Sequence, residues 1–310
     1  MLEIATEEES TDLMVPALVG LMDGACLTGN LLEARLHVAA IANLAMTSPD
    51  REGFDRSILN TRARWCEASV LWYLGYPDQA ANSGFQALKL IRSWGNALEL
   101  AQLLNNCHPV FLLSGDLSTA RRFAEESLSV ADRFGLRNQL AWATFNLGQS
   151  LVFEGKPDQG VPQMLLGMAG HEEAGNRIKT WMLAPLANGY RLLGDTEKGL
   201  DMVDRALAMA NETGELLWKS EILRLKGELI LLDGGATSEA ERLFKEAIGV
   251  AQAQAAKSWE LRASLSLARL LRNQGKRDLV VGTLKPICDW FTEGFRTPDF
   301  IEAKSFLAAS

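Results

Sequence analysis

The 310-residue chain is poor in the side chains that most often build metal and catalytic centres. Its three histidines, His37, His108 and His171, are far apart and fall in different periods of the repeat described below. Its four cysteines never form a C-x-x-C pair, so the sequence predicts neither a zinc site nor a disulfide framework. No G-x-x-x-x-G-K-S/T, G-x-G-x-x-G, G-x-S-x-G or H-E-x-x-H motif occurs. We therefore predict a protein that is not an enzyme, with no catalytic residues, no metal and no cofactor.

The chain also lacks an excess of positive charge and any long apolar run. Its net charge is −8 and its isoelectric point is near 5.1, whereas binding to nucleic-acid phosphates depends on clustered lysine and arginine. The first ten residues, MLEIATEEES, are acidic and contain no apolar core of a signal peptide. Apolar stretches such as Leu229–Leu232 are far shorter than a membrane span. These features predict a cytoplasmic protein with no membrane partner and disfavour nucleic acid.

Proline is scarce, with 9 residues in the whole chain, and this favours helices over strands. Alanine, leucine and glutamate, which lose little side-chain freedom in a helix, are spread along the sequence. Hydrophobic residues make up 47% and charged residues 23%, as in a well-packed folded protein. Because the length exceeds that of most single compact cores, we expect an all-α protein built as an elongated repeat array.

Glycines recur at a spacing that indicates a helical repeat. One series stands 39 to 46 residues apart, at Gly29, Gly75, Gly115, Gly155, Gly194, Gly235 and Gly275. A second series lies half a period out of step, at Gly95, Gly135, Gly175, Gly214 and Gly294, with Ala255 or Ala256 where one more is expected. Glycine adopts the left-handed conformation that ends many helices, so both series mark helix ends. The runs between them carry apolar residues at i, i+3, i+4 and i+7, which predicts two amphipathic helices per period.

Other residues mark helix starts and close helix contacts. Asp116, Asp195 and Ser238 are expected to cap helices, and Pro77 and Pro157 stand where a first helical turn accepts proline. Small residues recur where two helix backbones would approach each other, as at Gly148, Gly160 and Gly167. This pattern is similar to the tetratricopeptide repeat, with a period of about 40 residues rather than 34.

The predicted fold is a right-handed superhelical solenoid of about seven tetratricopeptide-like hairpins with a C-terminal capping helix. We assign residues 1–310 to a single repeat domain, because one hairpin cannot bury its own apolar stripe and its neighbours must stack on it. The expected hairpins span residues 12–47, 56–94, 96–134, 136–174, 176–213, 215–254 and 256–293, and the cap spans 298–309.

Five segments carry a more specific resemblance. They are Leu74–Ala80, Arg224–Leu229, Ala256–Ala263, Trp290–Phe295 and Thr297–Asp299. Together they resemble the C-terminal repeat region of large bacterial signalling proteins, in which an adenylate cyclase or DNA-binding domain precedes a STAND-type ATPase. The resemblance implies a sensor or partner arm and a signalling ATPase or cyclase as a partner. The chain has neither the nucleotide-binding motif nor the metal-binding aspartates of those catalytic domains.

The first helix of each hairpin is expected to line a concave groove that binds a protein or peptide. Tryptophan and arginine dominate binding hot spots, and both gather at the expected groove positions. The candidate partner-binding residues are Trp65, Trp72, Asn105, His108, Trp142, Phe145, Gln149, Trp181, Asn188, Arg191, Arg224, Arg262, Arg269 and Arg272. An aromatic middle with a basic end suits an extended peptide that carries acidic groups or a free carboxylate.

Each of these residues has a structural alternative. The tryptophans can pack on the next hairpin, the arginines can lie on a solvated face, and His108 can fill a gap where a small residue is usual. Two functions therefore remain open: a regulatory module that binds a polypeptide, and an arm that senses a small ligand or nucleotide state for a signalling ATPase or cyclase.

Overall fold

The computed structural model describes residues 11–47, 56–94 and 96–308, and this part of the chain forms helices only. The helices and their bounds, in chain order, are α2 (Thr11–Leu27), α3 (Leu31–Thr47), α4 (Arg56–Leu74), α5 (Pro77–Trp94), α6 (Ala97–Leu113), α7 (Leu117–Arg133), α8 (Arg137–Phe153), α9 (Pro157–Glu173), α10 (Thr180–Leu193), α11 (Thr196–Thr213), α12 (Lys219–Leu232), α13 (Thr237–Ala253), α14 (Lys257–Asn273), α15 (Arg277–Trp290) and α16 (Pro298–Ala308).

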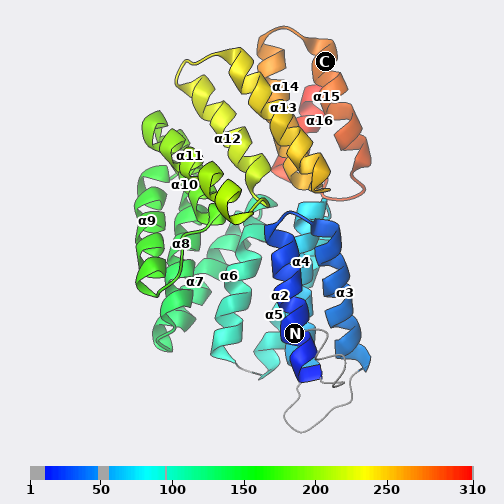
Figure 1. Cartoon of the computed structure of the whole chain (residues 1–310), viewed down its shortest axis with the longest axis vertical. Helices are drawn as coiled ribbons and strands as arrows, with labels where there is room; N and C mark the ends of the chain where they lie inside the picture. The colour runs from blue at the N-terminus through cyan, green and yellow to red at the C-terminus, as the bar shows by residue number, and fades with distance from the viewer. Residues whose placement is uncertain (1–10, 48–55, 95, 309–310) are drawn as a thin grey trace.

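Consecutive helices pair into hairpins that stack side by side, from α2 and α3 at one end to α14 and α15 at the other (Figure 1). The short helix α16 packs against both α14 and α15, as expected of a cap. Neighbouring first helices also touch, as α6 does with α4 and α8, so the hairpins form a layered solenoid. The predicted all-α solenoid is confirmed. None of these described helices is long and apolar enough to cross a membrane.

The glycine series does mark helix ends. Its members within the described residues have positive φ, with one shift: Gly234, at +77°, takes the turn that Gly235 was expected to make. The chain has a one-residue insertion there, and the first glycine of the pair ends the helix. Ala255 adopts a φ of +55° at the position that lacks a glycine. Gly95 lies outside the described residues.

The helix starts follow the sequence in four of five cases. Asp116 and Asp195 accept hydrogen bonds from the backbone N–H groups of Thr119 and Lys198, at 3.1 and 3.2 Å. Helices α5 and α9 begin at Pro77 and Pro157. The prediction for Ser238 was wrong, because the N-cap of α13 is Ala236, two residues earlier, and it makes no side-chain hydrogen bond.

The predicted close approach of two helix backbones occurs between α8 and α9. A Cβ atom at Gly148 would stand 2.7 Å from the Gly160 carbonyl oxygen. A Cβ atom at Gly167 would stand 2.5 Å from the backbone nitrogen of Phe145. Both distances are below van der Waals contact, so a larger residue would force the two helices apart.

The solenoid curves until its two ends meet, and we call this meeting line the seam. The Ser258 hydroxyl donates to the Trp72 carbonyl at 2.5 Å, and the Trp72 and Trp259 rings lie 5.0 Å apart. A second contact joins the start of α5 to the end of α15, where the Glu293 carboxylate accepts the backbone N–H groups of Asp78 and Gln79 at 2.9 and 3.0 Å. In Figure 1 the turns of α2 and α4 meet the lower ends of the C-terminal hairpins.

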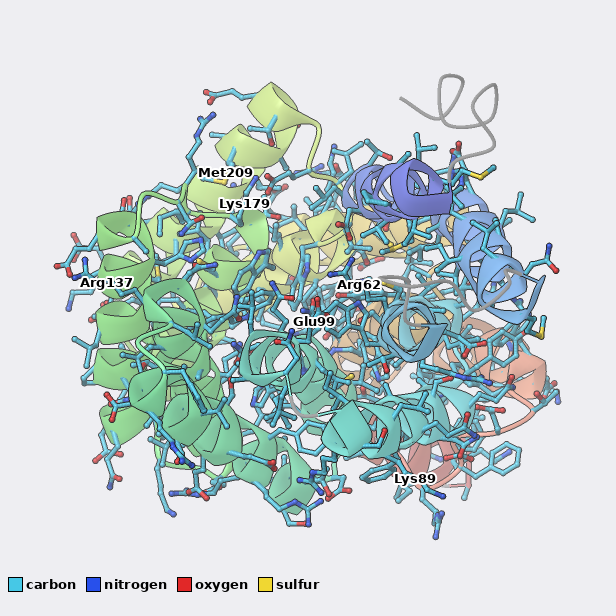
Figure 2. The ribbon with its side chains drawn as sticks, turned by 90° about the horizontal axis from the view of Figure 1, so that it is seen from below. Arg62, Lys89, Glu99, Arg137, Lys179 and Met209 are labelled. Carbon is cyan, nitrogen blue, oxygen red and sulfur yellow. The ribbon has the colours of Figure 1, made fainter. Side chains whose placement is uncertain are left out.

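Two of the turn glycines are also contact points of the seam. A Cβ atom at Gly75 would stand 2.7 Å from the Trp290 ring, and one at Gly294 would overlap the Pro77 ring. At the other end of the seam, the Leu27 carbonyl accepts the backbone N–H of Leu216 at 2.7 Å. The first helices of the hairpins border the two spaces described below, and we call this inner region the central hollow. Figure 2 shows the helices from below, with their side chains filling the space between them.

Candidate functional site

The central hollow contains an aromatic cavity of about 360 Å³. Helices α2, α4, α6, α8 and α10 and the turn before α12 each contribute to its wall, so every hairpin up to the sixth takes part. We call it the aromatic cavity. Its lining residues are Met22, Asp23, Cys26, Leu27, Trp65, Cys66, Ser69, Trp72, Tyr73, Asn106, Pro109, Val110, Leu113, Trp142, Lys179, Trp181, Leu217 and Trp218.

Tryptophan rings on neighbouring helices hold one another in place around this cavity. Trp142 and Trp181 stack at 5.2 Å with their planes 34° apart, and Phe145 meets the Trp181 ring edge-on at 5.7 Å. On the opposite side, Trp72 and Trp218 both pack against the fully buried Trp259, at 5.0 and 5.1 Å. Aromatic pairs in these geometries are favourable beyond the area that they bury, so the cavity is preformed by its own walls.

Few polar groups reach the aromatic cavity. The Lys179 ammonium is held by the Glu215 carboxylate at 2.6 Å. The Asn106 amide donates to the Gln102 carbonyl at 2.8 Å. Asp23 is exposed to solvent on one side and has no ion pair or hydrogen bond within the described part of the chain. Partial burial raises the pKa of its carboxyl above the ordinary value.

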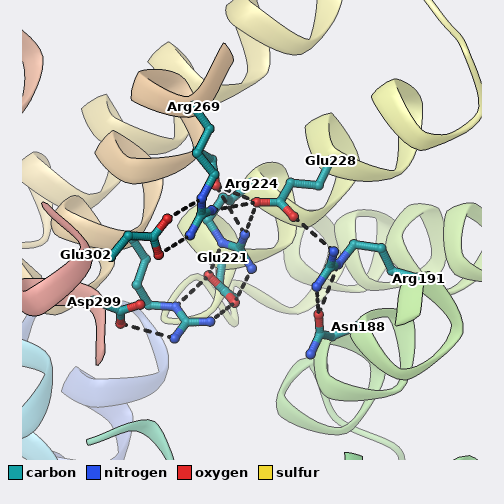
Figure 3. A network of polar contacts seen from close by, with 10 residues as sticks. Asn188, Arg191, Glu221, Arg224, Glu228, Arg269, Asp299 and Glu302 are labelled. Atoms are coloured by element: carbon teal, nitrogen blue, oxygen red, sulfur yellow. Dashed lines mark hydrogen bonds and ion pairs between the residues drawn. The ribbon is translucent and has the colours of Figure 1, made fainter. Parts of the chain in front are cut away.

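A second hollow of about 470 Å³ has apolar residues of α6, α7 and α8 in its lining, together with charged residues of α10, α12, α14 and α16. Its wall holds a network of ion pairs, drawn in Figure 3, that we call the arginine network. The network has four guanidinium groups and four carboxylates. Its charged members are Arg191, Arg224, Arg262, Arg269, Glu221, Glu228, Asp299 and Glu302.

Arg224 is the centre of the arginine network. Its guanidinium contacts Glu221 and Glu228, both at 2.7 Å, and donates to the Ser266 hydroxyl at 3.2 Å. Burial by itself would raise the pKa of Glu221, but Arg224 and Arg262 overcome this effect and lower that pKa to about 2. Glu221 and Arg224 are therefore both charged near neutral pH, and each is compensated by the other.

The remaining arginines of the network are paired as well. Arg191 contacts Glu228 at 3.2 Å, and Arg269 contacts Glu302 of the capping helix at 2.7 Å. Arg262 lies between Glu221 at 3.1 Å and Asp299 at 3.3 Å. The sequence suggested a basic end of the groove that could bind acidic groups of a peptide. In the structure, α12 and α16 supply a carboxylate partner for each of these four arginines, so none of them is uncompensated.

Arg272 stands apart from both hollows. Its guanidinium lies over the Phe306 ring, 4.0 Å from the centroid, where it covers the capping helix. Arg62, on α4, pairs with Glu99 of the next hairpin. Figure 2 shows Arg62 and Glu99 near the middle of the molecule, whereas Lys89 lies at its outer edge.

Four of the candidate residues are buried between α6 and α8. The Asn105 amide donates to the Gln139 side chain at 3.0 Å, and the Gln149 amide donates to Asn146 at 3.3 Å. His108 meets the Ser150 hydroxyl at 2.9 Å, and burial lowers its pKa to about 3, so the ring is neutral. Phe145 is fully buried.

These placements decide which candidates a partner could reach. Asn105, His108 and Phe145 have no exposed surface, so for these three the expectation of a position on an accessible groove is corrected: they pack between hairpins. Gln149 reaches only a small cavity near Trp218. Trp65, Trp72, Trp142 and Trp181 come together in the aromatic cavity, and Asn188 joins the second hollow beside the arginine network. Their binding role stays a prediction.

Three cavity residues were not among the predicted candidates: Trp218, Tyr73 and Asp23. Trp218 precedes α12, outside the helical positions that were expected to face the groove. Tyr73 follows Trp72 in the last turn of α4 and also lines the cavity. Asp23 lies on α2, whose tryptophan-free sequence gave no signal of a cavity. An unusually hydrophobic loop between α11 and α12, ELLW, was the one available hint for Trp218.

The comparisons with known proteins bear on the fold. The sequence matches no protein-family model and no curated protein. The apo form of RapI is similar in structure, with 14% identity, a TM-score of 0.57, and coverage of 90% of this chain and 93% of that chain. Aspartyl phosphate phosphatase F from Bacillus subtilis has 14% identity, a TM-score of 0.57, and coverage of 96% and 75%.

A third similar structure is the Rap conjugation gene regulator of the plasmid pLS20 in complex with the Phr peptide. It has 10% identity, a TM-score of 0.57 and coverage of 95% of each chain. At these identities the likeness shows the fold alone. It agrees with the hairpin pattern in the described residues and confirms a tetratricopeptide-like solenoid.

Proposed function

We propose that the chain, acting as one module, is a non-catalytic regulatory protein that binds a polypeptide partner in its central hollow. The observation that carries this proposal is the aromatic cavity, an unfilled space of about 360 Å³ walled by five tryptophans from α4, α8, α10 and the turn before α12. Buried tryptophans in preformed pockets are typical binding hot spots. The structure of the similar pLS20 regulator with the Phr peptide supports a peptide as the class of ligand.

The arginine network has a different place in this proposal. Its guanidinium groups already have carboxylate partners, so an anionic group of the ligand would have to displace an internal ion pair. The contact surface is therefore the aromatic cavity and the hollow around it, and the network serves as the rigid far wall.

Trp142→Ala tests the proposal. Trp142 is half-buried and stacks on Trp181, so its removal opens the cavity wall without touching the seam. Partners are captured from the source organism, identified by mass spectrometry, and titrated calorimetrically against wild type and variant. We expect Trp142→Ala to lower the affinity for a true partner by at least tenfold, since hot-spot truncations cost about 2 kcal/mol or more of binding free energy.

The matched control is Phe134→Ala. Phe134 is an exposed aromatic residue at the end of α7 and does not line the cavity. Affinity should be the same as for wild type. Equal affinity of Trp142→Ala and wild type for every captured polypeptide would exclude the cavity as the binding surface.

A second candidate function is a sensor of a small ligand or nucleotide state for a signalling ATPase or adenylate cyclase. The size of the aromatic cavity favours it, since small-molecule pockets begin at about 300 Å³. The sequence resemblance to the repeat arms of such proteins supports the same function. A neighbouring gene for the ATPase or cyclase, and a thermal shift with nucleotides or metabolites, are the expected observations. The absence of both would argue against it.

A further inference from the structure

The charges around the aromatic cavity do not cancel. Among its lining residues, Asp23 and Lys179 are the two charged side chains. The Lys179 ammonium is compensated by Glu215, whose other oxygen accepts the Thr180 backbone N–H at 3.3 Å. Asp23 has no partner within the described residues, so the cavity carries one uncompensated negative charge at its rim.

The field of Asp23 is felt across the cavity wall. Desolvation raises the pKa of the Cys26 and Cys66 thiols, and the negative charge of Asp23 raises both further. Cys26 is on α2 and Cys66 is on α4, and both line the cavity. The negative potential of the Asp23 carboxylate therefore extends into the space between α2 and α4. Tryptophan rings line the same cavity, and the faces of such rings attract cations.

We propose that the aromatic cavity binds an organic cation, an ammonium group on an apolar stem, presented by a basic side chain of the polypeptide partner. This inference rests on the proposed function and specifies its ligand. An ammonium group would compensate Asp23 and contact the ring faces of Trp65, Trp142 and Trp181, while its stem would fill the apolar remainder. A neutral group of the same shape gains only the apolar contacts, and an anion is repelled.

Two pairs of probes of equal shape and different charge test this inference. Choline is compared with 3,3-dimethylbutanol, and a lysine-centred pentapeptide is compared with its norleucine counterpart. Binding is followed by tryptophan fluorescence of the full chain and confirmed by calorimetry. We expect each cation to bind at least tenfold more tightly than its neutral isostere.

Asp23→Asn identifies the source of the preference. The substitution keeps the size of the side chain and removes its charge, so both cation preferences should fall to less than threefold while the neutral probes keep their affinity. Asp201→Asn is the control, because Asp201 is an exposed carboxylate on α11 outside the cavity and should leave both ratios unchanged. Circular dichroism verifies the fold of each variant.

Each outcome decides the inference. Equal binding of cation and isostere in both pairs, or a preference that persists in Asp23→Asn, overturns it. A preference in the choline pair alone overturns the polypeptide source and leaves a free small amine as the ligand. The calorimetric test of Trp142→Ala against captured partners is independent of these probes, so the loss of the cation preference does not affect the proposed function.

Discussion

The aromatic cavity and the arginine network lie on neighbouring parts of the same concave surface, yet they differ in what they leave unsatisfied. In the cavity, tryptophan faces and Asp23 border about 360 Å³ of unfilled space. In the network, Arg224 has all its charge compensated by Glu221 and Glu228 at 2.7 Å. Equivalent positions of the repeat therefore border unfilled space in one region and form internal ion pairs in the other. The two regions differ in whether a neighbouring helix supplies a side chain of opposite charge.

The strongest test of this comparison is Arg224→Met. The substitution keeps an unbranched side chain but removes the central cation from the buried Glu221 and the half-buried Glu228. Breaking a buried ion pair in this way costs about 3–5 kcal/mol, so we expect that loss in urea-induced unfolding. Choline affinity, measured on the folded variant, should not change, because the network is not part of the cavity.

Arg242→Met is the matched control, since Arg242 makes two ion pairs of similar length on an exposed helix face. It should cost less than about 1 kcal/mol. Equal losses for the two variants would mean that burial does not distinguish the network from the surface.

The seam provides the second test, because it ties α4 of the cavity wall to α14 of the network. Gly294→Ala places a methyl group against the Pro77 ring at a φ of +74°, and we expect a loss of about 3 kcal/mol. Gly275 has the same φ and open space around it, so Gly275→Ala reports the backbone strain alone, about 1 kcal/mol.

Small-angle X-ray scattering should show a larger radius of gyration for Gly294→Ala than for Gly275→Ala, and the cavity should lose affinity for choline as its α4 wall moves. The same radius and the same stability for both variants would show that the seam does not hold the two regions together.

Low pH should reduce folding stability through the two regions at different pH values, and this effect is smaller than those of the substitutions above. Buried His108, behind the cavity wall, has a folded-state pKa of about 3 against an ordinary 6.5, so stability is lost as the pH falls below 6.5. At pH 5 this loss amounts to about 2 kcal/mol. In the network, the pKa of Glu221 is lowered to about 2 from 4.5, so its contribution is kept at pH 5 and is lost only below about 4.5.

His108→Gln isolates the first of these effects, because glutamine can still bond to the Ser150 hydroxyl but does not titrate. Between pH 7 and pH 5, the variant should lose about 2 kcal/mol less than wild type in urea unfolding. His171 titrates in both proteins and so cancels from the difference. Parallel pH profiles would mean that the buried ring is protonated without penalty.

Local signals in the sequence were sufficient for the fold. Glycine spacing placed the helix ends, even where Ala255 takes the left-handed conformation in place of glycine. The errors at Gly235 and Ser238 are shifts of one and two residues in the same turn between α12 and α13, where the chain has an inserted residue. The tryptophans of the cavity were found because repeat position alone brings Trp65, Trp142 and Trp181 to the inner face.

The distribution of charge was not predictable in the same way. Asp299 and Glu302 compensate Arg262 and Arg269 from the capping helix, more than thirty residues along the chain. Asp23 shares one cavity with Trp218 only because the solenoid curves until α2 approaches the turn before α12. Such contacts depend on the small rotation between successive hairpins, summed over the whole array, and no single repeat contains that information.

The seam also restricts how the chain can change over generations. An open solenoid can gain or lose a repeat at little cost, since each repeat contacts only its neighbours. Here the turn at Gly75 must meet Trp290, and the start of α5 must meet Glu293. Duplicating or deleting one 40-residue unit would shift these surfaces relative to each other and break the contacts of the seam. The number of hairpins between them is therefore a fixed dimension of the molecule, like the number of strands in a closed barrel.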